Sequence, residues 1–185
     1  ALPEAREVVP FHHLIRDSRR DNLDSSKGPK SETDHAPVSR VHGDYTTENA
    51  PMRLAQLQDQ GRVSKDVKSY AIINTWRSLG DQPLRSKPLA LLDATSKDFD
   101  AEFPYALIHD DKVGYNYSIA YDPRHQWTYY PKMIKDELLA FFTFDGRQQP
   151  PKIVFHTAIE EPSDHRQSAP PRRSIEVRSL VTFDN

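Results

Sequence analysis

The sequence predicts a mainly β fold of the sandwich or barrel type, and three observations support this prediction. Short apolar segments rich in β-branched and aromatic residues recur along the chain, Pro- and Gly-containing turns separate them at short intervals, and helical periodicity is scarce. The chain has 185 residues, which is the size of one domain. Residues 1–185 are therefore expected to form a single domain.

The expected strands begin close to the first residue and end close to the last. Residues 8–15 form an apolar, β-prone segment, and residues 38–45 suit the end of a strand. The remaining expected strands are residues 70–79, 88–96, 114–122, 127–133, 137–146, 152–159 and 174–183. Because β structure starts and stops almost at the chain ends, we expect the chain to be a portion of a longer protein, truncated on its N-terminal side.

One helix is expected over residues 47–62, between the second strand and the third. Leu54 and Leu57 stand there at helical spacing. Thr47 is a residue type that caps a helix at its start, and Gly61 is a residue type that ends one.

Two further segments are expected to lie outside the strands. Residues 134–140 offer a short second helix with Asp136 and Glu137 in its first turn. Residues 16–37 are charged, rich in Ser and without periodicity. They are expected to form a long loop that is exposed or disordered.

The composition excludes several classes of function. The 25 Lys and Arg residues nearly balance the 27 Asp and Glu residues, so no electrostatic attraction to nucleic acid or to an anionic membrane is expected. No apolar segment is long enough for a membrane-spanning helix, and the first residues do not resemble a signal peptide. The chain has no Cys, which excludes thiolate metal sites and Cys nucleophiles. We expect a cytoplasmic protein.

The segment His42-Gly43-Asp44 raises the question of a metal site. With 8 His in the chain, about 0.8 His-x-Asp pairs are expected by chance, so the pair alone is weak evidence. Oxygen-activating ferrous enzymes hold iron with two His and one carboxylate and keep the other positions open. On a strand, residues i and i+2 point to one side, as two neighbouring ligands require.

His156 is the candidate for the third ligand. It lies in an apolar strand segment, KIVFHTAI, where a buried imidazole needs a hydrogen-bond partner or a metal. A lone His of this kind is more often a core residue, but the His42 and Asp44 pair upstream favours a metal site made of His42, Asp44 and His156.

The other histidines are weaker candidates. A second pair, His109 and Asp111, stands in a segment typical of a hydrated hairpin turn. His12 and His13 are adjacent on an expected strand, so only one of them can point inward. His125 and His165 stand in polar turns.

A candidate carboxylate-binding pair follows the candidate ligand His156. Arg172 and Ser174 are two apart on an expected strand and point to the same side. A guanidinium fork with a hydroxyl suits the distal carboxylate of a dicarboxylic acid such as 2-oxoglutarate. Arg178 lies on the same face by parity and is the alternative binder, while an ordinary basic turn is the competing interpretation.

A third group of polar residues stands in the strand segment INTWRSL. Asn74 and Trp76 share one face, and Arg77 takes the other. A charged group in such a strand needs a partner. Arg77 is expected either to form a salt bridge with Asp93 or Glu176 or to contact a carboxylate of the substrate.

Aromatic residues in the segment WTYYPKM are candidates for the substrate pocket. Trp127, Tyr129 and Tyr130 could form an aromatic wall over a small molecule. Packing within the β fold is the alternative explanation for all three.

The ordered set of motifs resembles a known family. The segments VHGDYT, INTWRSL, KPLALLDATS, HQWTYYPKMIKDELLAFFTFD, FHTAI and PPRRSIEVR follow one another over residues 38–183. Together they resemble a family of oxygenases found largely in fungi and bacteria and described as hydroxylase/desaturase, cephamycin methoxylase-chain-like or gibberellin-desaturase-like. Each motif alone is weak, and the ordered set is specific.

The resemblance implies a non-haem Fe(II), 2-oxoglutarate-dependent dioxygenase of secondary metabolism that acts on a small molecule with dioxygen. The implied fold is a double-stranded β-helix (jelly-roll or cupin-like) with a few flanking helices. By motif, the resemblance places Fe(II) on His42, Asp44 and His156, the cosubstrate carboxylate on Arg172 and Ser174, and the substrate pocket beside Asn74 and Arg77. Phe155 and Ile159 depart from the Pro and Phe that are usual around the distal His, and family members usually have a longer N-terminal region.

Two rival interpretations stay open from the sequence. One is an Fe(II) oxidase that uses no 2-oxoglutarate, and the other is a non-catalytic β-barrel binding module or a degenerate paralogue. The choice between hydroxylation, desaturation and cyclisation, the substrate and the existence of a homodimer are left open too.

Overall fold

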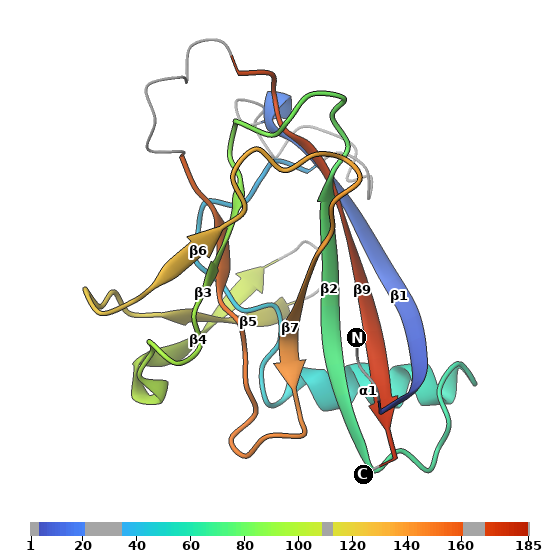
Figure 1. Cartoon of the computed structure of the whole chain (residues 1–185). Helices are drawn as coiled ribbons and strands as arrows, with labels where there is room; N and C mark the ends of the chain where they lie inside the picture. Colours follow the sequence, from blue (N-terminus) through green and yellow to red (C-terminus); the bar gives the residue numbers. More distant parts are fainter. Residues whose placement is uncertain (1–3, 21–34, 109–112, 161–168, 185) are drawn as a thin grey trace.

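In the described part of the chain, a four-stranded sheet, a three-stranded sheet and a two-stranded sheet are accompanied by one α-helix and two 3-10 turns, η1 (Ser18–Arg20) and η2 (Phe99–Ala101) (Figure 1). The structure is a computed structural model that describes residues 4–20, 35–108, 113–160 and 169–184. Most elements are strands, which confirms the predicted mainly β class. Within the described residues the sheets do not close into a barrel.

The larger sheet is antiparallel and has the strand order β1-β9-β2-β7. Its strands are β1 (Ala5–Asp17), β2 (Ser69–Ser78), β7 (Leu139–Asp145) and β9 (Arg173–Phe183). The first strand runs to Asp17 and so extends into the segment that was predicted to be a loop from residue 16 onward. The rest of that segment, from 21 to 34, lies outside the described residues.

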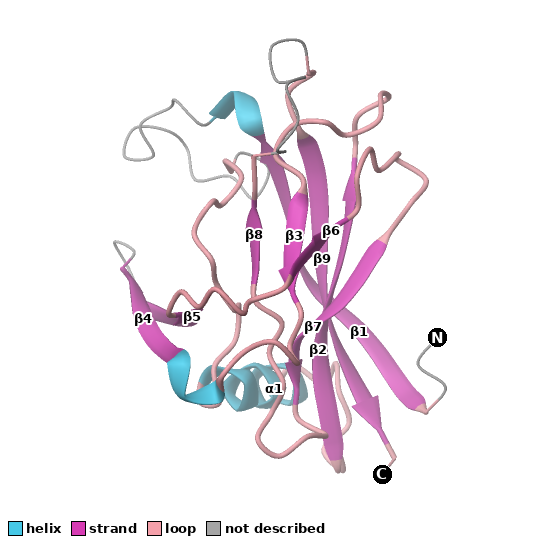
Figure 2. Cartoon of the chain, turned by 60° about the vertical axis from the view of Figure 1, so that its left-hand side comes forward, coloured by secondary structure: helices cyan, strands magenta, loops and turns pink. Residues whose placement is uncertain are grey.

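The smaller sheet has the order β6-β3-β8, and a hairpin of β4 and β5 stands beside it (Figures 1 and 2). These strands are β3 (Leu89–Leu92), β4 (Glu102–Ile108), β5 (Val113–Ile119), β6 (Trp127–Tyr129) and β8 (His156–Ala158). Bridges from His42 to His156 and from Gly43 to Tyr117 join the sheet and the hairpin through the segment that contains the His-x-Asp pair. The candidate ligands therefore lie in the middle of one continuous β surface.

Strand β4 was missed in the sequence, and the helix expected at 134–140 does not form. The sequence of β4 contains Pro104, which cannot donate to a strand ladder and so argued against a strand. At 134–140 the chain makes a turn in which the Glu137 N–H donates to the Ile134 carbonyl, and the Glu137 carboxylate accepts from the Ile134 N–H at 2.9 Å. This turn leads directly into β7, which leaves no room for a helix.

Helix α1 (Asn49–Asp59) confirms the helix predicted in this region. Leu57 is buried in a cluster with Val63 and Leu180 that attaches the helix to the larger sheet. The residue at the N-cap position is Glu48 and not the predicted Thr47, and the Thr46 hydroxyl accepts the Asn49 N–H at 3.1 Å.

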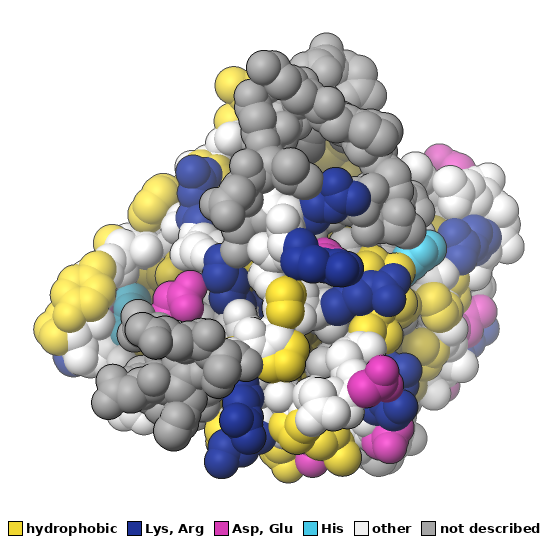
Figure 3. Space-filling view, turned by 90° about the horizontal axis from the view of Figure 1, so that it is seen from above, with side chains coloured by type: hydrophobic (Ala, Val, Ile, Leu, Met, Phe, Trp, Pro, Cys, Tyr) yellow, Lys and Arg dark blue, Asp and Glu magenta, His cyan; other side chains and the backbone are white. Residues whose placement is uncertain are grey.

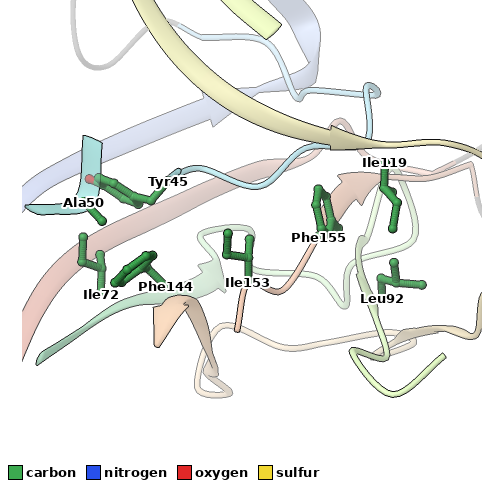
Figure 4. Close-up of a cluster of buried hydrophobic side chains, with 8 residues drawn as sticks. All are labelled: Tyr45, Ala50, Ile72, Leu92, Ile119, Phe144, Ile153 and Phe155. Atoms are coloured by element: carbon green, nitrogen blue, oxygen red, sulfur yellow. The ribbon is translucent and has the colours of Figure 1, made fainter. Parts of the chain in front are cut away.

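The main hydrophobic cluster fills the space behind the His-x-Asp segment (Figure 4). Its buried members are Tyr45, Ala50, Ile72, Leu92, Ile119, Phe144, Ile153 and Phe155. Gly43 packs directly on this cluster, since a Cβ placed there would lie 2.6 Å from Cγ2 of Ile153. The segment can approach the cluster closely only because residue 43 has no side chain.

No helix of the described residues is long and apolar enough to cross a bilayer.

Candidate metal centre

His42, Asp44 and His156 form a buried group between the two sheets. The segment around His42 pairs with β8 through two backbone hydrogen bonds, of 3.1 Å from the His42 N–H and 2.9 Å from the His156 N–H. One ligand atom from each of the three side chains lies within 4.8 Å of the others. His42 and Asp44 are each 7% exposed and His156 is 2% exposed, so the group is shielded from solvent.

The hydrogen bonds of both imidazoles orient their Nε2 atoms toward Asp44. The Nδ1 atom of His42 lies 2.8 Å from the Arg40 carbonyl, and that of His156 lies 3.2 Å from the Val154 carbonyl. A carbonyl only accepts, so both Nδ1 atoms carry the proton and both Nε2 atoms keep a free lone pair. Each Nε2 lies 3.8 Å from an oxygen of Asp44. This arrangement is typical of His ligands that are fixed by an outer hydrogen bond.

The protonation states of His42 and Asp44 suit the binding of a cation. Burial lowers the pKa of His42 to about 4, with a further contribution from His156, so this imidazole is neutral near pH 7. Burial alone would raise the pKa of Asp44, but the positive charge of Arg178 holds it below its usual range. An anionic carboxylate and a neutral imidazole are the protonation states in which such groups bind a metal.

Two residues of the larger sheet hold the Asp44 carboxylate. Asn74 in β2 donates to its Oδ2 at 2.7 Å, and Arg178 in β9 donates to its Oδ1 at 3.0 Å. Arg178 also donates to Glu176 at 2.9 Å. The structure thus places Arg178, predicted as an alternative carboxylate binder for a cosubstrate, in a network with Asp44 and Glu176 instead.

A cavity of about 10 Å³ lies beside the three candidate ligands. It is lined by Arg16, Val38, His42, Trp76, Leu89, His156, Thr157, Ala158, Arg172 and Glu176. Such a volume holds about one water molecule.

Of the predicted carboxylate-binding pair, Arg172 lines this cavity, and Ser174 lies next to Arg172. The Arg172 Nε donates to the Ser174 hydroxyl at 3.0 Å and Nη1 donates to the Lys87 carbonyl at 2.7 Å. The guanidinium stands over the ring of Trp76, 5.0 Å from its centroid. Both Arg172 and Ser174 are almost fully buried, as is Trp76.

Three residues predicted for the substrate pocket lie elsewhere. Arg77 is exposed and follows Trp76 on β2, so it points away from the cavity. Trp127 and Tyr129 are not among the residues that line the cavity, and Trp127 packs against the main hydrophobic cluster instead. The partner of Glu176 is Arg178 and not the predicted Arg77.

Arg16 is a cavity residue that the sequence did not reveal. It lies in β1, inside the range predicted to be a loop, and pairs with Ser174 of β9. Arg16 shares a strand face with Leu14 by parity, so an extension of the strand predicted over residues 8–15 could have identified it. Of the weaker candidates, His12 and His13 lie in β1, and His125 is half-buried with its Nε2 atom enclosed. The positions 109, 111 and 165 fall outside the described residues.

The chain belongs to an oxidoreductase family. Residues 1–182 match the family described as "Oxidoreductase/YMDC permease-like domain". This confirms the oxidoreductase class that the sequence motifs indicated.

Relatives in fungi make the class more specific. The chain is 30% identical to "Hydroxylase/desaturase efuI" of Hormonema carpetanum, over 96% of this chain and 64% of the relative. It is 28% identical to "Alpha-ketoglutarate-dependent dioxygenase tstK" of Talaromyces stipitatus, over 97% of this chain and 64% of the relative. The chain therefore spans about 64% of the length of these relatives. The names of these relatives confirm the family resemblance that the sequence motifs indicated.

A solved structure has the same fold. It is the "iron and alpha-ketoglutarate-dependent endoperoxidase NvfI", with a TM-score of 0.80, 23% sequence identity and coverage of 98% of this chain and 64% of that chain. At 23% sequence identity, this structural similarity establishes the fold alone.

Proposed function

We propose that this chain contains the iron and cosubstrate sites of an Fe(II)- and 2-oxoglutarate-dependent dioxygenase. The observation that carries the proposal is the buried group of two Nε2 atoms and one carboxylate, all within 4.8 Å of each other. The names of the relatives support the same chemistry. The substrate would be a small molecule of secondary metabolism, oxidised with dioxygen in the cytoplasm.

His42, Asp44 and His156 would hold the metal. Two neutral imidazoles and a carboxylate suit ferrous iron and leave further positions for other ligands. Bound iron would supply the activation of dioxygen. The protein's contribution is to fix the two imidazole rings through the Arg40 and Val154 carbonyls and to shield the group from water.

Arg172 and Ser174 would bind the distal carboxylate of 2-oxoglutarate. The Arg172 guanidinium is held in place by its hydrogen bonds to the Ser174 hydroxyl and the Lys87 carbonyl. A buried guanidinium held in one orientation suits a carboxylate. The cosubstrate would be converted to succinate and carbon dioxide while the small molecule loses two electrons.

The outcome of the reaction would depend on where the substrate carbon sits. Hydroxylation, desaturation and cyclisation all start from the removal of hydrogen, and positioning selects among them. Of the predicted pocket residues, Trp76 lines the cavity, and Asn74 donates a hydrogen bond to Asp44.

Succinate formation tests this proposal. Fe(II)-loaded protein with 2-oxoglutarate and oxygen should form succinate slowly without any added substrate, and Arg172→Ala should reduce succinate formation at least about tenfold. Arg77→Ala, an exposed Arg on the far side of the same sheet, is the matched control. Oxygen consumption without succinate would indicate the rival Fe(II) oxidase. Neither oxygen consumption nor metal binding would indicate a binding module.

A further inference from the structure

The β4–β5 hairpin continues the β surface that carries the candidate metal ligands, and its register shows which side chains share their face. Tyr117 of β5 pairs with Gly43 through backbone hydrogen bonds of 2.8 and 3.1 Å. Side chains alternate along a strand and opposite residues share a face, so Asp44 and Asn116 lie together on the other face. Asn116 pairs with Tyr105 of β4. Tyr105 therefore lies on the face that carries Asp44.

The packing of the opposite face agrees with this assignment. The residues of both segments that belong to the main hydrophobic cluster or pack against it are Val41, Tyr45, Tyr117 and Ile119. All four have the parity of Gly43 or of its partner, and none has the parity of Asp44 or Asn116. Phe103 pairs with Ser118, which has the parity of Asn116, so Phe103 shares the face of Tyr105.

Arg40 joins Tyr105 to the candidate metal ligands. The Cζ atom of Arg40 lies 5.3 Å from the centroid of the Tyr105 ring. The carbonyl of Arg40 accepts the Nδ1 proton of His42 at 2.8 Å, so the same residue also orients a candidate ligand. Burial raises the pKa of Tyr105, with a smaller contribution in the same direction from Asp44. The Tyr105 phenol is thus within electrostatic reach of the candidate ligands.

This face of the hairpin is accessible to a ligand. Phe103 is 47% exposed, Arg40 is exposed and Tyr105 is half-buried. Aromatic rings stack on other flat rings, and an exposed guanidinium pairs with an anionic oxygen. The three side chains together therefore suit a molecule that has both features.

Arg40 is separate from the residue proposed to bind the cosubstrate. Arg172 directly precedes β9, and Figure 3 shows Lys and Arg side chains gathered at the end of the molecule where β1 ends and β9 begins. In Figures 1 and 2 the hairpin lies away from this end, toward α1. An anionic group paired with Arg40 would therefore belong to a second molecule and not to the cosubstrate.

We propose that Phe103, Tyr105 and Arg40 bind the small-molecule substrate, and that this substrate carries a flat apolar ring and an anionic oxygen. The inference rests on the proposed function, because the face that holds these residues also carries the candidate metal ligands. The two aromatic side chains would stack on the ring, and the Arg40 guanidinium would pair with the anionic oxygen. The substrate surface is thus assigned to β4 and the segment before His42, and not to β6.

Binding of 2-naphthoate, a flat ring with one carboxylate, tests the inference. Calorimetric titration of the Fe(II)-loaded protein, with saturating 2-oxoglutarate and no oxygen, would compare it with the uncharged naphthalene-2-carboxamide. Arg40→Gln should weaken 2-naphthoate binding about 3- to 10-fold and leave binding of the amide unchanged. Tyr105→Ala and Phe103→Ala should each weaken the binding of both probes about 3- to 10-fold.

Tyr115→Ala is the matched control. Tyr115 is 53% exposed on the same hairpin, but it pairs with Ala106 on the opposite face. This variant should bind both probes like the unaltered chain. Tyr105→Leu keeps most of the apolar volume but has no ring, and it replaces Tyr105→Ala if circular dichroism shows that variant unfolded.

The outcomes separate this inference from the proposed function. An unaltered chain that does not bind 2-naphthoate, or hairpin variants that bind it equally well, would overturn the inference, while succinate formation would still support the proposed function. Equal weakening in Tyr115→Ala would overturn it as well, since the hairpin as a whole would then be responsible. The expected losses in a protein that forms no succinate would contradict the proposed function and overturn the role of this surface as a substrate site.

Discussion

Arg178 donates a hydrogen bond of 3.0 Å to Asp44, across the space between the last strand and the His-x-Asp segment. The two residues are 134 positions apart in the sequence, and both side chains are largely buried. The bond fixes one carboxylate oxygen of Asp44 while Asn74 fixes the other. Asp44 is therefore held in a defined orientation by the larger sheet before any ligand is present.

The first prediction concerns the removal of Arg178. Arg178→Gln should lower the free energy of unfolding by about 3–5 kcal/mol, because it leaves the Asp44 and Glu176 carboxylates buried without their cation. Urea unfolding of the metal-free protein measures this change. Arg77→Gln, exposed on β2, should change the free energy of unfolding by less than about 0.5 kcal/mol. A loss in Arg178→Gln as small as that of the control would show that the network does not stabilise the fold.

The second prediction concerns the pH dependence of stability. The pKa of His42 is about 4 in the folded chain and near 6.5 when unfolded, so the unfolded chain binds more protons between these values. The free energy of unfolding should therefore fall by up to about 3 kcal/mol as the pH drops from 6.5 to 4. Asp44 contributes over a different pH range. Because its pKa is lower in the folded chain than the usual Asp value, its ionised carboxylate stabilises the fold at pH above that usual value, and this stabilisation is lost as the pH falls further.

Metal-free protein unfolded in urea at a series of pH values measures this effect. His42→Gln should show a flatter dependence between pH 6.5 and 4, because the titrating group is gone. His13→Gln, an exposed His in β1, should keep the dependence of the unaltered chain. An identical slope in His42→Gln would contradict the assignment of the effect to His42.

The third prediction concerns Gly43, between the two candidate ligands. Gly43→Ala should destabilise the fold by about 1–3 kcal/mol, because the new Cβ would lie 2.6 Å from Ile153. Gly114→Ala is the control, since the nearest atom to a Cβ there is 3.8 Å away. Adding Ile153→Ala should relieve the clash, so the double variant should lose less than the sum of the single variants. Additive losses measured by urea unfolding would rule out this contact as the cause.

Much of the fold and the central group of the site could be predicted from the sequence. Strands β2 and β9 were predictable because long runs of β-branched and aromatic residues lie between clear turn signals. His42 and Asp44 were predictable as neighbours because strand parity directs residues two apart to one side. His156 followed from the conflict between an imidazole and its apolar segment.

Other features depend on contacts that no local pattern reports. Arg178 and Ser174 have the same parity on β9, yet only the three-dimensional register decides that Arg178 meets Asp44 and that Ser174 meets Arg16 and Arg172. The faces of Trp127 and Tyr129 were equally undetermined, since alternation fixes relative and not absolute direction. Arg16 was overlooked because charged residues follow it directly, which hid the end of its strand.

We propose above that His42, Asp44 and His156 form a ferrous iron site to which 2-oxoglutarate adds. The visible metal-to-ligand charge-transfer band, recorded after addition of Fe(II) and 2-oxoglutarate in the absence of oxygen, tests this site. We expect a band that is absent in His42→Ala and His156→Ala, weaker in Arg172→Ala and unchanged in His13→Ala. A protein that binds no iron, or a band that persists when both His42 and His156 are replaced, would contradict the claim.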